Sequence, residues 1–173
     1  MYRFFFYFFI ILLNLSCGGR SENVAGQFTI DVPIDIGAGL PPTKTHYFLH
    51  RDVEIKFDEY LKTLGLSSKE VTRVEPASAI LTMINRGVHW SFVEHATIYV
   101  FDPDYPKDEY LAFRTEFIPM NIGENLNILP FQVDLTSFFI SSSIGLRAGL
   151  HFRGASPQTI ESILRLKFNI IVE

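Results

Sequence analysis

The chain has 173 residues, of which 47% are hydrophobic and 20% are charged, and its formal net charge at pH 7 is −4. This length suits a single domain with a substantial hydrophobic core. With 15 basic and 19 acidic residues, the charge balance argues against a nucleic-acid partner, because nucleic-acid-binding surfaces need clustered lysine and arginine.

The N-terminus has the pattern of a secretory signal. Ten apolar residues at positions 4–13 follow Arg3, and Cys17, the only cysteine of the chain, comes four residues after them. The apolar run is too short to cross a membrane, which needs roughly 20 residues, but it has the length of a secretory h-region. We therefore expect residues 1–16 to be a signal peptide that is removed.

The residues around Cys17 resemble the lipobox of bacterial lipoproteins. Ser16 fills the small position before the cysteine, and Leu15 is an apolar neighbour, whereas Asn14 stands where the motif prefers an aliphatic residue. The resemblance implies that Cys17 carries diacylglycerol and palmitate and anchors the protein to the outer membrane of a bacterial cell envelope. An ordinary cleaved signal is the alternative, but it would leave an unpaired thiol on a secreted chain.

After Cys17 the pattern changes from a tether to strands. Residues 17–26 are mostly small and polar, which suits a lipidated N-terminus and a flexible tether, and the domain is expected over residues 27–173. Apolar and polar residues alternate over residues 28–36, which predicts a strand with one buried face. Pro33 makes it an edge strand, because proline cannot donate a ladder hydrogen bond.

The remaining elements follow with short turns between them. A second strand is predicted at residues 46–57, and a short helix begins at Asp58 and is ended by Gly65. In the strand at residues 109–117 the alternation assigns Phe113 and Phe117 to one face. The other strands are predicted at residues 71–84 with an interruption near Pro76, 92–101, 125–135, 144–152 and 164–172.

Seven or eight half-buried strands with one short helix predict an all-β fold. An antiparallel β-sandwich is favoured, because two sheets that are each apolar on one face must cover one another. A closed β-barrel is the alternative.

Two segments resemble features of the small all-β lipoproteins of Bacteroidota. They are the strand F-V-E-H-A-T-I-Y-V at residues 92–100 and the segment V-D-L-T at residues 133–136. The resemblance implies a turn of helix after V-D-L-T and no activity that could be carried over. Ser21, Glu22 and Asn23 match the surface-export signal of such lipoproteins poorly, so whether the domain faces the periplasm or the cell surface stays open.

The candidates for chemistry are weak. His46 and His50 would share a strand face but lie about 13 Å apart, too far to share a zinc ion. Asp102, Asp104 and Asp108 form a candidate calcium loop, although a solvated turn is the favoured interpretation. No serine lies in a nucleophile elbow. We therefore expect no catalytic residue, no cofactor and no metal.

The aromatic residues Trp90, Tyr99 and Phe101 are the candidate face for a partner or ligand. The sequence favours a noncatalytic cell-envelope lipoprotein, an accessory or assembly subunit that binds a partner protein at the outer membrane. One alternative is a lipoprotein that binds a carbohydrate or small ligand. The other is a hydrolase, which would need an acid, a base and a nucleophile in one pocket.

Overall fold

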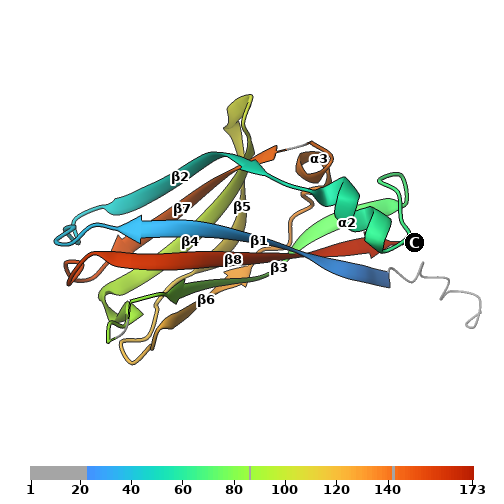
Figure 1. The fold of residues 1–173 in the computed structure, drawn as a ribbon. Coiled ribbons are helices and arrows are strands. Elements are labelled where there is room, and N and C mark those ends of the chain that lie inside the picture. The colour runs from blue at the N-terminus through green and yellow to red at the C-terminus, as the bar shows by residue number, and fades with distance from the viewer. Residues whose placement is uncertain (1–22, 86, 142) are drawn as a thin grey trace, which may run out of the picture.

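A computed structural model describes residues 23–85, 87–141 and 143–173, and it forms one antiparallel sheet of eight strands in the order β1-β8-β3-β6-β5-β4-β7-β2 (Figure 1). The predicted all-β fold of about seven or eight antiparallel strands with one short helix is confirmed. The strands are β1 (Asn23–Ile36), β2 (Thr45–Glu54), β3 (Val71–Met83), β4 (Val93–Asp102), β5 (Tyr105–Thr115), β6 (Asn125–Pro130), β7 (Ser143–Phe152) and β8 (Ile160–Val172); the helical segments are α2 (Phe57–Thr63), the 3-10 turn η1 (Trp90–Phe92) and α3 (Thr136–Phe139).

The sheet curls until its two halves face one another (Figure 1). One half contains β1, β8, β3 and β6, and the other contains β5, β4, β7 and β2. The halves join where Phe113 and Arg114 of β5 pair with Pro130 and Leu129 of β6. The architecture therefore has the two facing layers of a sandwich, but both layers belong to one continuous half-barrel sheet.

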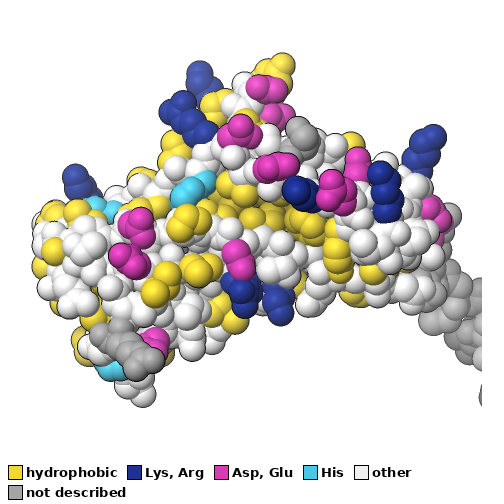
Figure 2. Space-filling view, viewed as in Figure 1, with side chains coloured by type: hydrophobic (Ala, Val, Ile, Leu, Met, Phe, Trp, Pro, Cys, Tyr) yellow, Lys and Arg dark blue, Asp and Glu magenta, His cyan; other side chains and the backbone are white. Residues whose placement is uncertain are grey.

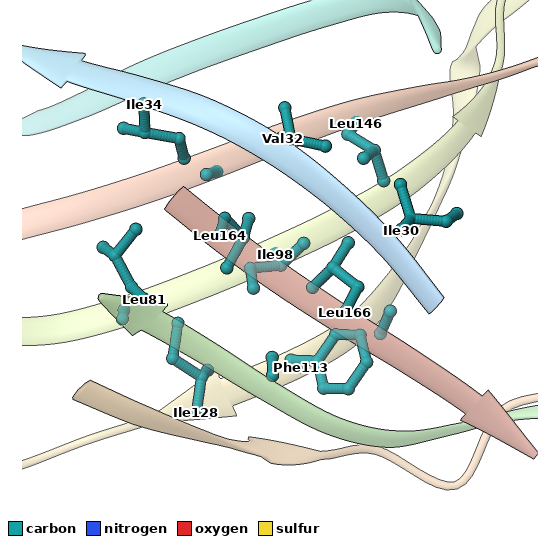
Figure 3. Close-up of a cluster of buried hydrophobic side chains, with 14 of the residues drawn as sticks. Ile30, Val32, Ile34, Leu81, Ile98, Phe113, Ile128, Leu146, Leu164 and Leu166 are labelled. Atoms are coloured by element: carbon teal, nitrogen blue, oxygen red, sulfur yellow. The ribbon is translucent and has the colours of Figure 1, made fainter. Parts of the chain in front are cut away.

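The core fills the space between the two halves. Alternate residues of each strand point inward, so aliphatic side chains of β1 and β8 meet those of β4 and β7 (Figure 3). Burying each such side chain contributes about 1.5–3 kcal/mol. The side chains labelled in the close-up include Ile30, Val32 and Ile34 of β1, Leu164 and Leu166 of β8, Ile98 of β4 and Leu146 of β7.

The two ends of the strand order, β1 and β2, form a seam at which apolar side chains reach the surface (Figure 2). Both edges carry features that oppose the addition of a further strand. Pro33 lies within β1 and has no N–H to offer, and β2 contains an irregularity between His50 and Val53. On the outer surface, Arg165 of β8 holds Asp31 of β1 through two hydrogen bonds of 2.7–2.8 Å and lowers the pKa of that carboxyl.

The predicted tether is too long, because β1 begins at Asn23 and not after residue 26. Asn23 lies opposite Val172 of β8, and a register shift follows between Val24 and Gly26. Gly26 has no side chain, and a Cβ there would lie 2.8 Å from Leu64 at the end of α2. Residues 23–26 therefore form the end of β1, which packs against α2, and are not part of a tether.

The segment predicted as one strand at residues 125–135 is also different. β6 ends at Pro130, and the chain then leaves the sheet for α3. Asp134 Oδ1 accepts a hydrogen bond of 2.9 Å from the backbone N–H of Thr136, and Thr136 Oγ1 accepts one of 2.9 Å from Val74 of β3. The V-D-L-T segment thus fixes the turn of helix that the resemblance implied.

Candidate functional site

A polar surface with several hydrogen-bonding side chains lies on the outer face of β4 and β7. It is a shallow hollow of about 470 Å³. In Figure 1, the start of β2, the start of β4 and the end of β7 lie at the left, whereas the start of β1 lies at the right. The 14 residues of β1 span roughly 40 Å, so the hollow lies far from the point where residues 1–22 join the domain. We call it the distal hollow; its lining is Thr45, His95, Thr97, Tyr99, Arg114, Glu116 and His151.

A glycine allows the floor of the distal hollow to form. Gly149 of β7 lies between Thr97 of β4 and Tyr47 of β2, its two cross-strand neighbours. A Cβ at this position would lie 2.8 Å from Thr97 Oγ1 and 2.9 Å from the Tyr47 ring. Only glycine therefore lets these two side chains approach over the backbone of β7.

A β-bulge brings a carboxylate next to two histidines. Val93 pairs with Phe152 and His95 pairs with His151, so Glu94 is an extra residue in β4. A bulge re-aims side chains that regular alternation would send to opposite faces. Glu94 Oε2 lies 3.8 Å from His95 Nε2 and 3.9 Å from His151 Nε2, and the three side chains are 32–38% exposed.

The backbone of this bulge is held from two sides. Ile118 donates its backbone N–H to the Glu94 carbonyl at 3.0 Å. Arg153 donates through its guanidinium to the Val93 carbonyl at 3.1 Å and to the Ile118 carbonyl. The carboxylate and imidazoles therefore project from a fixed stretch of β4.

The rim of the hollow carries an exposed aromatic ring on a strained backbone. Phe117 has a φ of 58° and is 77% exposed, and its ring centroid lies 5.7 Å from that of His95. A left-handed conformation costs a residue with a side chain about 1–2 kcal/mol. The burial and hydrogen bonds of the next residue, Ile118, hold the chain in this conformation.

Next to the hollow, an arginine is stacked between two tyrosines. The Arg147 guanidinium lies 4.9 Å from the ring centroid of Tyr47 and 4.7 Å from that of Tyr99, and it pairs with Glu109. Each cation–π contact contributes about 0.5–1 kcal/mol at an exposed site. Together with Phe117, this stack presents aromatic faces and fixed charges on one side of the domain.

Of the three residues of the predicted aromatic face, only Tyr99 lies at the surface, where it lines the distal hollow. Trp90 is fully buried, and its indole N–H donates to the Glu124 carbonyl at 2.9 Å. Phe101 is also buried, because its ring occupies the space that the missing side chain of Gly145 leaves free. Neither Trp90 nor Phe101 is available to a partner or ligand.

This close contact predicts that Gly145→Ala destabilises the domain by about 1–3 kcal/mol, because the new methyl group would overlap the Phe101 ring and force it to move. Gly154→Ala is the matched control, since no atom lies near the position of its added Cβ, and it should change stability by less than about 0.5 kcal/mol. Urea unfolding of the two variants measures the difference. Equal effects would contradict the contact.

The candidate calcium loop is a hairpin turn. β4 ends at Asp102 and β5 begins at Tyr105, so Asp108 belongs to a strand, and Asp102 Oδ1 accepts a hydrogen bond of 2.9 Å from the N–H of Asp104. Across the described ranges, no three His, Cys, Asp or Glu side chains form a group that could hold a metal ion. Cys17 lies outside the described residues. No helix among those described is both long and apolar enough to cross a bilayer.

The sequence interpretation did not group the residues of the distal hollow. His95 and His151 are separated by 55 intervening positions and meet only because β4 pairs with β7. Tyr47 and Arg147 meet Tyr99 for the same reason. The available signal was the alternation of apolar and polar residues over residues 92–101 and 144–152, which places His95 and Tyr99 on one face of the first strand and Arg147 and His151 on one face of the second. This alternation does not give the order of the strands in the sheet.

The fold and this surface define an all-β domain of eight antiparallel strands with an aromatic and polar hollow on one outer face. No family model matches the chain, and a search of curated proteins finds no significant match.

Proposed function

We propose that this protein is a noncatalytic lipoprotein of the bacterial cell envelope, anchored to the outer membrane through Cys17, and that it binds a partner protein with the surface around the distal hollow. The partner is an envelope protein that offers an apolar patch with polar groups around it. The protein serves as an accessory or assembly subunit of the complex.

The observation that carries this proposal is Phe117. A protein gains nothing in its own stability from exposing most of a large aromatic ring on a left-handed backbone. Strain of this kind persists where the surroundings enforce it, and it concentrates at functional positions. An exposed ring fixed in this way supports a role in contact with another molecule.

The composition of the surrounding surface supports a protein as that molecule. Tyrosine and arginine are enriched among the residues that dominate the binding energy of protein interfaces. Tyr47, Tyr99 and Arg147 are held against one another before any partner arrives, so little side-chain entropy is lost on binding.

The position of the surface also fits an anchored protein. The lipid at Cys17 would hold the end of the domain at which β1 begins. The hollow is lined by residues at the start of β2, near the start of β4 and near the end of β7, and these strand ends lie opposite the start of β1 in Figure 1. A partner could reach the hollow without displacing the anchor.

The test of this proposal is Phe117→Gly. Glycine adopts a positive φ without strain, so the variant should be as stable as the wild type or more stable by about 1 kcal/mol. It should nevertheless lose the partner that co-purifies with the wild-type protein from native membranes in mild detergent. Urea unfolding and quantitative mass spectrometry of the purified complexes measure the two effects.

Tyr105→Ala is the matched control. Tyr105 is another strongly exposed aromatic residue, but it lies at the β4–β5 turn, at the other end of β4 from His95. Its removal should leave the partner bound. An unchanged set of co-purifying proteins in Phe117→Gly would refute the proposal.

Carbohydrate binding is the second candidate. The distal hollow presents the hydroxyl groups of Thr45, Thr97 and Tyr99 next to an aromatic ring and the Arg114–Glu116 ion pair, which are the groups that could bind to the hydroxyls and ring face of a sugar. Retention of the purified protein on immobilised envelope polysaccharide, with no protein partner recovered from membranes, would favour this function over the first.

A further inference from the structure

Within the described part of the chain, the carboxylate of Glu94 at the edge of the distal hollow has no lysine or arginine partner. Its ionisable neighbours are His95 Nε2 at 3.8 Å and His151 Nε2 at 3.9 Å, and histidine is largely neutral above about pH 7. The other acidic side chains of this surface, Glu109 and Glu116, are each paired with an arginine. Glu94 therefore presents an uncompensated negative charge at neutral pH.

The other charged and titratable groups around the carboxylate do not supply the missing positive charge. Arg114 forms its ion pair with Glu116 on the β5 side of the hollow. Arg153, which follows β7, donates its guanidinium to two backbone carbonyls. The phenol of Tyr99 on β4 belongs to a group that is uncharged below about pH 9. The charge beside the carboxylate is therefore set by the protonation of the two imidazoles.

We propose that Glu94 binds a lysine or arginine side chain of the partner protein while the two imidazoles are neutral. The inference rests on the proposed function, because it names the group by which the partner enters the distal hollow. The Phe117 ring is 77% exposed, and its centroid lies 5.7 Å from that of His95. A cation is attracted to an aromatic face within about 6 Å of the ring centroid. The carboxylate and the aromatic ring thus attract the same charged group, and the apolar stem of that group packs against the rings.

The same two histidines make this contact depend on pH. Their ring centroids lie 5.6 Å apart, and both rings lie next to the carboxylate. Protonation places positive charge beside the partner's cation, and the imidazolium groups pair with Glu94 in its place. Two unit charges roughly 5 Å from a cation weaken its binding by about tenfold even at the dielectric constant of water. We therefore expect the partner to be held at pH 7.5 and released at pH 5.5, values on either side of about 6.5, where histidine titrates.

The first test is a nuclear magnetic resonance titration of the full chain in detergent with two synthetic peptides, acetyl-Leu-Lys-Leu-amide and acetyl-Leu-Gln-Leu-amide. At pH 7.5 the lysine peptide should bind about tenfold more tightly than the glutamine peptide and should shift the ring signals of His95, His151 and Phe117. At pH 5.5 this preference should disappear. Equal affinities of the two peptides at pH 7.5 would overturn the inference.

Three variants assign the preference to its residues. Glu94→Gln should abolish it at both pH values. Glu161→Gln is the matched control, because it removes an exposed carboxylate from β8 in the other half of the sheet, and it should keep the preference. His95→Gln combined with His151→Gln should retain the preference at pH 5.5. Urea unfolding should show all three variants as folded as the parent, since the substituted side chains are partly or largely exposed. Loss of the preference in Glu161→Gln, or its survival in Glu94→Gln, would contradict the assignment.

Co-purification from native membranes distinguishes this inference from the proposed function. The partner is defined as the protein that Phe117→Gly loses. It should leave the wild-type protein during a wash at pH 5.5, and Glu94→Gln should recover several-fold less of it at pH 7.5. Loss of the partner in Phe117→Gly with full recovery in Glu94→Gln would overturn the role of the carboxylate and leave the proposed function standing. An unchanged set of proteins in Phe117→Gly would refute the proposed function itself, and with it a cation supplied by that partner.

Discussion

Phe168→Asp is expected to prevent the domain from folding. Phe168 of β8 is fully buried, and its ring centroid lies 4.7 Å from that of Phe139 in α3 and 5.8 Å from that of Phe113 in β5. The substitution removes these contacts and places a carboxylate in the core without a partner. Large-to-small changes of a core aromatic residue cost about 3–5 kcal/mol, and burial of an unpaired polar group adds about 1–3 kcal/mol. Domains of this size have only about 5–15 kcal/mol of stability in total.

Lys167→Asp is the matched control, because it introduces the same carboxylate one residue earlier in β8, on the opposite face of the sheet. It should cost less than about 1 kcal/mol. Far-ultraviolet circular dichroism and urea unfolding of the two variants measure the contrast. Similar losses in both would contradict the assignment of inward and outward faces in this strand.

The inward face of β8 is the part of the fold that the sequence predicts best. Leu164, Leu166, Phe168 and Ile170 alternate with polar residues, and all four are buried. Period-two alternation is a local property of the strand, so no knowledge of its neighbours is needed. Pro33 is a second local signal. Its missing N–H predicted an edge strand, and Pro33 does lie in β1, which is at one edge of the sheet.

Phe117 shows where this reasoning fails. Alternation assigned it to the same face as Phe113, which is buried, whereas Phe117 is exposed beyond the end of β5. The reversal comes from a single positive φ, and contacts with Ile118 and Arg153 enforce it. Those contacts join segments that are distant in the sequence. The alternation of apolar and polar residues within one strand therefore cannot predict them.

The distal hollow was beyond prediction for a related reason. Its residues come from β2, β4, β5 and β7, and the order of these strands in the sheet is not their order in the sequence. The position of Glu94 beside His95 and His151 depends on the bulge, and the bulge in turn depends on the pairing of β4 with β7. The surface that we propose to bind a partner thus forms only when the order of the strands in the sheet brings these residues together.

The second large effect is expected at the N-terminus, where Cys17→Ser should abolish incorporation of a fatty acid. The apolar run and Ser16 before the cysteine predict acylation of Cys17, and two or three acyl chains are needed for stable anchoring. Cells grown with a tagged fatty acid should therefore label the wild-type protein and leave the Cys17→Ser variant unlabelled. The label is read on the immunoprecipitated protein.

A control variant distinguishes the position of the cysteine from its mere presence. In Cys17→Ser with Ser21→Cys, the thiol lies four residues further from the apolar run, where a lipobox-directed enzyme should not modify it. This variant should also remain unlabelled. Because residues 1–22 precede β1, neither change should alter urea unfolding of the domain. Label on the displaced cysteine, or none on the wild type, would contradict lipidation at Cys17, and the distal hollow would then have to bind its partner without an acyl anchor.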